Sequence, residues 1–223
     1  MHNGSKVTGI DPLLVVTMLW DANKASEPFS SMYDESWVEK LYWGFRRNLT
    51  VRFRFICFTD RERELPPFIH QMRITSESPA YNDFTEPYKL NRPMILVGLD
   101  TIVVSNIDHY VQYCLTANKT ALPAAIYRPK TVCNGVALVP SNQKWIFDEW
   151  NGENDMKVMR DHYANGRVEM LDKIFPNEIV SYKKHVKPVG RLLPENKIVF
   201  FHGKEKPHEL NEPWIREHWR CQL

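Results

Sequence analysis

Continuous runs of apolar residues recur along the chain, and they predict a sheet that is buried on both faces. The clearest are residues 13–19 (LLVVTML) and 94–97 (MILV), whose uninterrupted apolar character is typical of central parallel strands covered by helices. Residues 51–58 predict a further strand, and residues 70–74 predict a short one at an edge of the sheet. A last apolar strand is expected at residues 197–201.

Apolar residues at helical spacing from Trp37 to Phe45 predict a helix between the first two strands. Asp34 can cap its start, and Asn48 closes it. The order strand, helix, strand favours a parallel, doubly wound sheet, because crossovers between parallel strands are right-handed. The other expected elements are helical segments around residues 87–92, 107–115, 145–150, 156–163 and 168–175, and short strands at residues 101–104, 124–127 and 135–139.

Length and composition indicate one folded unit with no general affinity for nucleic acid. At 223 residues with 43% hydrophobic content, the chain can bury one sizeable core, so we expect a single domain. The 29 Lys and Arg against 27 Asp and Glu give a net charge of +2, which is too even for a nucleic-acid binder. A basic cluster at residues 46–54 fits a solvated strand face, because Phe53 and Phe55 alternate with its arginines.

Cysteine usage and the absence of long apolar runs favour a cytoplasmic location. The four cysteines are scattered and form no Cys-x-x-Cys pair, so reduced thiols fit better than structural zinc. No apolar run approaches the roughly 18 residues of a membrane span, and the first residues lack the apolar region of a signal peptide. We therefore expect a soluble cytoplasmic protein without a transmembrane segment; the oligomeric state is left open.

Candidate chemistry centres on Asp100, which follows the apolar run 94–97. In open α/β sheets ligands bind at the carboxyl ends of the strands, and a carboxylate there can hold a hard cation. Asp60 follows another expected strand, and His202 follows the last one. Carboxylate and imidazole together suit an ion such as Mn²⁺. The alternatives are a turn-forming Asp100 and an ordinary loop histidine at position 202.

Several segments of the chain resemble glycosyltransferases of GT-A fold. The matching segments are residues 41–60, 88–108, 179–186 and 197–207, and the resemblance extends from Leu13 to about Leu210. The group is that of glycogenin and the bacterial lipopolysaccharide galactosyltransferases, and the similarity is greatest to bacterial and viral members. It implies an α/β fold with a single GT-A (Rossmann-like) domain over residues 1–223 and a mostly parallel central sheet flanked by helices. The nucleotide-binding half would span about 10–110, the acceptor-side half about 111–210, and a C-terminal tail 211–223.

The resemblance also implies an activity and a set of site residues. Such enzymes transfer a sugar from a nucleotide-diphosphate donor, here a UDP-sugar, to a glycan, lipid or protein acceptor. Mn²⁺ or Mg²⁺ bridges the diphosphate. By position, Asp100 and His202 would be the metal ligands. Each lysine of the expected donor site could equally be a solvated surface residue. The residues expected to contact the donor are Trp20, Lys24, Asp60, Lys89, Leu99, Gly203, Lys204 and Lys206.

Three motifs depart from the pattern of these enzymes. Gly98 stands where the Asp-x-Asp motif has its first carboxylate, so metal affinity should suffer. Where these enzymes commonly have Gly-Asp-Gln, this chain reads Gly-Arg-Val-Glu, so Glu169 is the polar residue left there for catalysis. Their acceptor-side Asn-Ser-Gly is Cys-Asn-Gly here, and Asn134 is its candidate residue. Two interpretations follow. The first is an active transferase that either tolerates a weakened metal site or replaces the metal's charge with Arg and Lys side chains, for which Arg167 is a candidate. The second is a degenerate relative that binds a nucleotide sugar, a glycan or a protein without turnover. A nucleotidyltransferase is a third, weaker possibility that the His-Gly-Lys-x-Lys-Pro ending argues against.

Overall fold

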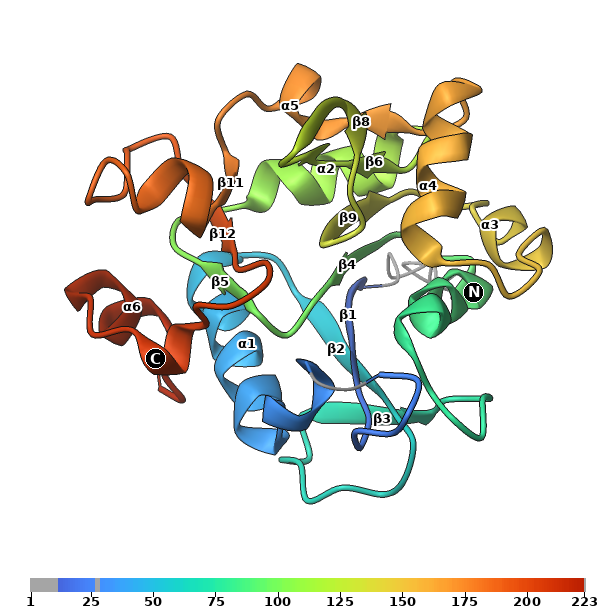
Figure 1. Ribbon diagram of the computed structural model, residues 1–223, viewed down its shortest axis with the longest axis horizontal. Coiled ribbons are helices and arrows are strands. Elements are labelled where there is room, and N and C mark those ends of the chain that lie inside the picture. The colour runs from blue at the N-terminus through green and yellow to red at the C-terminus, as the bar shows by residue number, and fades with distance from the viewer. Residues whose placement is uncertain (1–11, 27–28, 223) are drawn as a thin grey trace, which may run out of the picture.

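The computed structural model describes residues 12–26 and 29–222, and its largest element is a seven-stranded, mostly parallel sheet (Figure 1). The remaining residues, which include the start of the expected nucleotide-binding half and most of the N-terminal segment expected to lack a signal peptide, lie outside the described part. The strand order is β10-β6-β9-β4-β1-β2-β3. Only β9 runs antiparallel to its neighbours β4 and β6. The predicted fold class is thus confirmed. The strands are β1 (Leu13–Leu19), β2 (Phe53–Thr59), β3 (Ile69–Arg73), β4 (Met94–Val97), β6 (Ala121–Leu122), β9 (Val136–Val139) and β10 (Glu169–Met170).

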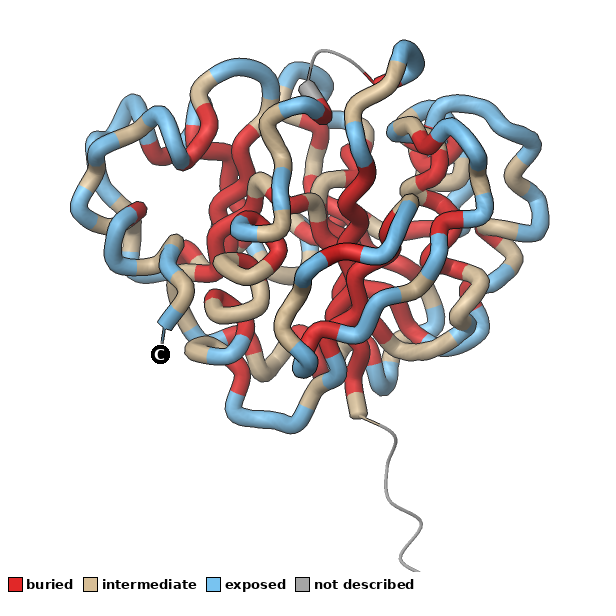
Figure 2. Tube along the Cα trace, turned by 90° about the horizontal axis from the view of Figure 1, so that it is seen from below, coloured by how far each residue is buried: buried red, intermediate tan, exposed pale blue. Residues whose placement is uncertain are grey.

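Helices cover both faces of the sheet, which explains the continuous apolar runs. Alternate residues of β1 enter two separate cores, with Val15 on one face and Val16 on the other. The first core takes α1 (Glu35–Asn48) and α2 (Asp108–Thr116), whereas the second takes α3 (Trp145–Asp148), α4 (Asp155–Ala164) and the 3₁₀ helix η2 (Tyr81–Leu90). Buried backbone therefore runs through the centre of the molecule in Figure 2. As expected, the Asp34 side chain caps α1 by accepting from Ser36 N.

The strand that follows Asp100 leaves the main sheet. β5 (Thr101–Val103) pairs antiparallel with β12 (Ile198–Phe200), and β11 (Ile179–Ser181) completes this smaller sheet. At its end the Phe201 amide donates to the Asp100 carbonyl at 2.9 Å. This pairing brings the segment that carries His202 beside Asp100, although the two lie about one hundred positions apart in the sequence.

Several short elements differ from the expectations. Residues 168–175 were expected to be helical, but β10 pairs with β6 first, and only α5 (Leu171–Ile174) is helical. The link between the strands expected at 124–127 and 135–139 contains β8 (Arg128–Val132), which pairs with β7 (Ala124–Ala125). The remaining elements are η1 (Phe29–Met32), the π-helical turn η3 (Tyr182–Val186), η4 (Pro207–Glu209) and α6 (Pro213–His218). No helix in the described ranges is long and apolar enough to cross a membrane.

Thiol labelling tests the burial of the cysteines. Cys57, Cys114 and Cys133 are buried and Cys221 is partly exposed, and none is in a disulfide. Burial raises the pKa of Cys133 to about 11 and that of Cys114 to about 12. Because the thiolate is the reactive form, Cys221 should be modified first in the native protein at pH 8, and the other three only after denaturation. Mass spectrometry of labelled peptides would contradict this burial if Cys133 reacted as fast as Cys221.

Candidate active site

The carboxyl ends of β1 and β4 meet at a topological switch point of the main sheet. The chain continues from β1 to β2 on one side, whereas β4 lies on the other side of β1. A crevice opens beyond such a point, and ligands of open α/β sheets bind there. Trp20 follows β1 directly, and Gly98, Leu99 and Asp100 follow β4. The position of Asp100 at the ligand-binding edge is therefore the one its sequence context predicted.

Two adjoining cavities occupy this crevice. The first, here called the β1/β4 cavity, has a volume of about 400 Å³ and is lined by residues that follow β1 and β4, Trp20 and Leu99 among them. The second, the β7/β8 cavity, has a volume of about 570 Å³ and is lined by the turn between β7 and β8 and by the segment after β12. The residues that line both are Tyr33, Tyr81, Asp100, Gly135, Met156 and His202.

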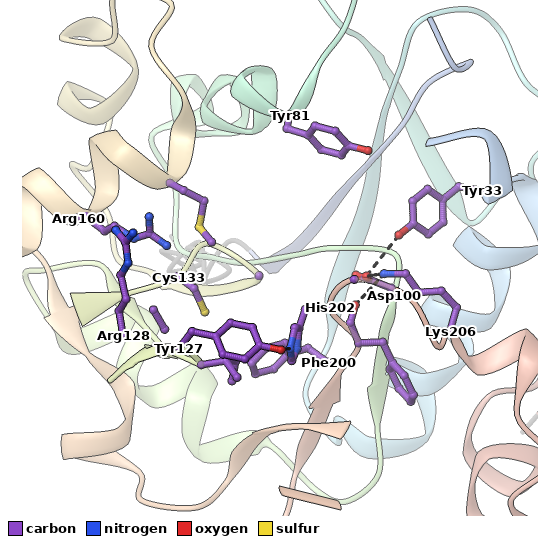
Figure 3. A pocket seen from close by; sticks show the side chains of 16 residues that line it. Tyr33, Tyr81, Asp100, Tyr127, Arg128, Cys133, Arg160, Phe200, His202 and Lys206 are labelled. Carbon is purple, nitrogen blue, oxygen red and sulfur yellow. Dashed lines mark hydrogen bonds and ion pairs between the residues drawn. The ribbon is translucent and has the colours of Figure 1, made fainter. Parts of the chain in front are cut away.

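Asp100 is held by two donors at the boundary between the cavities (Figure 3). Its Oδ2 atom forms an ion pair with Lys206 Nζ and accepts a hydrogen bond from Tyr33 Oη at 3.3 Å. The Lys206 side chain is only 4% exposed, whereas that of Asp100 is 23% exposed. Burial and the neighbouring Asp100 raise the pKa of Tyr33, so its hydroxyl remains a proton donor. The result is a buried cation beside the carboxylate that was expected to bind metal.

The loop after β12 folds back on itself to place Lys206. Gly203 and Glu205 have φ angles of 68° and 70°, in the left-handed region that glycine adopts without strain. The Glu209 side chain accepts from the Lys206 amide at 2.9 Å and fixes the start of η4. Lys206 Nζ then donates to the Phe201 carbonyl at 2.8 Å. The His-Gly-Lys-x-Lys-Pro motif thus builds a tight loop that turns one of its lysines inward.

His202 lines both cavities but already has a neighbour for each ring nitrogen. Nδ1 lies 3.2 Å from Ser181 Oγ, and Nε2 lies 3.3 Å from Tyr127 Oη (Figure 3). Burial lowers the pKa of His202, and the positive charges of Lys183 and Lys206 lower it further. The imidazole is consequently neutral at pH 7.

Four histidines whose rings are partly shielded from water predict a loss of stability in mild acid. Burial lowers the pKa of four histidines below the ordinary value of 6.5. The folded state then favours their neutral form, so their contribution is present above pH 6.5 and is lost as the pH falls through the folded-state pKa values. Chemical denaturation between pH 7 and pH 5 should show a decreasing free energy of unfolding, and a rising value would contradict these burial effects. The four are His162, His185, His202 and His218.

A second carboxylate lines the β1/β4 cavity, and sequence reasoning missed it. Asp155, the first residue of α4, is buried, and its Oδ2 accepts from Asn134 Nδ2 at 3.0 Å. Burial raises the pKa of Asp155. Asn134 Oδ1 is buried with no hydrogen-bond partner in the described part of the chain, so it offers a free acceptor. The only signal for Asp155 was an acidic residue at a helix start, which usually indicates nothing more than capping.

The expected donor-site residues fall into three groups. Trp20 and Leu99 line the β1/β4 cavity, and the Trp20 ring packs edge-on against Tyr81 with centroids 5.9 Å apart. Gly203 and Lys206 line the β7/β8 cavity. Four of the expected residues line neither cavity. Lys24 and Lys204 are exposed. Asp60 pairs with Arg63 at 2.7 Å, and Lys89 pairs with Glu86.

Glu169 and Arg167 also lie outside the residues that line the two cavities. Glu169 sits in the edge strand β10, and its Oε2 accepts from Tyr113 Oη at 3.0 Å. Arg167 pairs with Glu149 and lies 3.8 Å over the Trp145 ring. The structure therefore brings Lys206, and not Arg167, next to Asp100.

The residues around Asp100 do not present a ligand set for Mn²⁺ or Mg²⁺. Such ions take mainly oxygen ligands, and the described ranges contain no group of three or more His, Cys, Asp or Glu residues that could hold a metal ion. Position 98 contributes no side chain. The Oδ2 atom of Asp100 is already occupied by the buried Lys206 ammonium, so an ion at that oxygen would compete with this ion pair.

Comparison with known proteins identifies the fold. No family model and no curated protein sequence matches the chain. Among solved structures, it is similar to the glycosyltransferase GlyE of Streptococcus pneumoniae, with a TM-score of 0.58 and 12% identity over 89% of this chain and 56% of that one. For the bifunctional glycosyltransferase WbbM the TM-score is 0.57, with 11% identity over 95% of this chain and 51% of that one.

A third similar structure is the galactosyltransferase LgtC in complex with donor and acceptor sugar analogues. Its TM-score is 0.52, with 12% identity over 87% of this chain and 89% of LgtC. The chain spans about half the length of GlyE and WbbM and most of LgtC. All three are glycosyltransferases, and the shared architecture extends over nearly the whole chain. The chain therefore has the GT-A glycosyltransferase fold.

Proposed function

We propose that the chain is a glycosyltransferase that binds a nucleotide-diphosphate sugar in the β1/β4 cavity and its acceptor on the β7/β8 side. The observation that carries this proposal is the Asp100, Lys206 and His202 cluster at the switch point, where both cavities meet. A departing nucleoside diphosphate develops negative charge, which positioned cationic donors stabilise. The aromatic ring of Trp20 suits the base of the nucleotide, and UDP is the first nucleotide to test.

The acceptor side has a basic wall. Arg128 and Arg160 line the β7/β8 cavity on the side opposite Asp100 (Figure 3). Guanidinium groups form bidentate hydrogen bonds with phosphate and carboxylate groups. A glycan, lipid or protein acceptor that carries an anionic group would fit this wall. A cytoplasmic location remains a prediction.

Asp155 is the candidate for acid–base chemistry in this proposal. It and Asp100 are the carboxylates among the residues that line the two cavities, and Asp100 is paired with Lys206. Burial raises the pKa of Asp155, which makes this carboxylate a stronger base than an ordinary aspartate. Asn134 Nδ2 holds the Asp155 carboxylate in place. Glu169, which the sequence suggested, contacts Tyr113 instead.

Donor hydrolysis and transfer test the proposal. The protein is incubated with a panel of UDP- and GDP-sugars, with and without Mn²⁺, and release of the nucleoside diphosphate is measured. Asp155→Asn should slow release at least about 100-fold, the usual size of an acid–base contribution. Asp161→Asn is the matched control, because Asp161 lies on the same helix, pairs with Lys157 on the surface and lines neither cavity.

The second candidate function is a binding module without turnover. It is favoured by the missing carboxylate at Gly98 and by the position of Glu169, which contacts Tyr113 and lines neither cavity. Tight binding of a nucleotide sugar, with no hydrolysis and no transfer for any donor, would support it over the enzyme. Absence of binding by every donor would contradict the enzyme and a module that binds nucleotide sugars, and would leave a module that binds a glycan or a protein.

A further inference from the structure

The Lys206 ammonium is built into the cleft as a fixed cation. The Lys206 side chain is buried, and the Asp100 carboxylate and the Phe201 carbonyl set the position of its ammonium group. An ammonium has three N–H donors, and these two acceptors use two of them. Lys206 also lines the β7/β8 cavity, beside its boundary with the β1/β4 cavity. One donor is therefore left without an acceptor among these contacts.

The charges at this point balance without a metal ion. In an Asp-x-Asp site two carboxylates and a divalent cation sum to zero. Here Gly98 removes one carboxylate, and Asp100 with Lys206 again sums to zero. The lost negative charge and the buried ammonium are thus complementary changes. A divalent ion added to the pair would face the positive charge of Lys206 at short range.

We propose that the Lys206 ammonium takes the place of the divalent cation, so that the cleft binds the diphosphate of its ligand without a metal. This inference rests on the proposed function, because it concerns the donor of that same site. In it Asp100 is a positioning residue that orients Lys206. The Tyr33 hydroxyl donates to the same Oδ2 atom of Asp100 and helps to fix the carboxylate.

Calorimetric titration with UDP and with GDP, in EDTA and in Mn²⁺, provides the first test. The Kd of the nucleotide that binds should agree within about twofold between the two buffers. A Kd that is at least tenfold lower in Mn²⁺, a difference of about 1.4 kcal/mol, would overturn the inference. Each titration uses the full-length chain.

Two variants separate the ammonium from a metal site. Lys206→Met should weaken nucleotide binding at least tenfold in EDTA, whereas Lys157→Met, which alters an exposed ion-paired lysine of α4, should not change it. Asp100→Asn keeps an amide oxygen that can accept from Lys206 and removes a negative charge beside the diphosphate. The affinity for the nucleotide should therefore be unchanged or higher. A metal-bridged diphosphate would instead lose affinity on Asp100→Asn, and that loss would overturn the inference even if Lys206→Met failed to fold.

Titration with Mn²⁺ alone distinguishes failure of this inference from failure of the proposed function. Electron paramagnetic resonance of free Mn²⁺ should show no stoichiometric binding by the wild-type protein without nucleotide. Stoichiometric binding that Asp100→Asn abolishes would overturn the ammonium inference and leave a nucleotide-sugar transferase possible. Failure of both UDP and GDP to bind in either buffer would overturn the proposed function together with the inference.

Discussion

Arg63→Met is expected to lower the free energy of unfolding by about 3 kcal/mol, because removing one partner of a buried ion pair costs about 3–5 kcal/mol. The Arg63 side chain is only 2% exposed and contacts three carboxylates. These are Asp60 at 2.7 Å, Asp21 at 2.9 Å and Glu35 at 3.0 Å. They come from the loops after β2 and β1 and from the first turn of α1. The lower end of the range applies because the three carboxylates are partly exposed.

Arg61→Met provides a matched control for this prediction. Arg61 pairs with the same Asp21 at 2.7 Å, but its side chain is 51% exposed. Exposed ion pairs contribute about 0–1 kcal/mol, so this variant should stay close to wild type. Both free energies come from urea denaturation followed by circular dichroism. An equal decrease in the free energy of unfolding for the two variants would contradict the role of Arg63 as the buried residue that holds the loops after β1 and β2 together.

The double variant Gly98→Asp/Lys206→Met is expected to gain an Mn²⁺ site that the wild-type protein lacks. A Cβ atom at position 98 would lie 3.1 Å from Asp100 Oδ1, so a new carboxylate would stand beside the existing one after a shift of a few tenths of an ångström. Two adjacent carboxylates with His202 nearby suit Mn²⁺ once the competing ammonium is removed. Affinity should rise at least tenfold over wild type, a change of about 1.4 kcal/mol.

The single variants give the comparison. Gly98→Asp alone adds the carboxylate but leaves Lys206 in place, so its gain should be much smaller than that of the double variant. Lys206→Met alone leaves only Asp100 and His202 as ligands. Mn²⁺ binding is followed by electron paramagnetic resonance. If Gly98→Asp bound Mn²⁺ as tightly as the double variant, Lys206 would not stand in the place of the cation.

The main elements could be predicted from sequence because their signals are local. The bounds of β1 match the apolar run 13–19, and α1 ends at Asn48 as its periodicity indicated. The two-residue strands β6 and β10 are too short to show any period, and they form because neighbouring strands offer partners. Likewise, nothing within residues 101–104 indicates that β5 joins β12 in a separate sheet.

The candidate site was only partly predictable, because its contacts join distant segments. Asp100 could be placed at a strand end by its local context. The ion pair between Asp100 and Lys206 spans 106 positions, so only the fold could reveal it. Asp155 was missed, since capping explains an acid at a helix start equally well. Arg167 was considered as the replacement for the metal's charge, but its pairing with Glu149 keeps it on the surface.

A structure of the protein with a bound UDP-sugar tests the central claim most directly. The account predicts the base beside Trp20 and a diphosphate oxygen within about 3 Å of Lys206 Nζ, the distance of a charge-assisted hydrogen bond. Asp100 should still contact Lys206 in that complex. Nucleotide bound away from the β1/β4 cavity, or a diphosphate that makes no contact with Lys206, would contradict it.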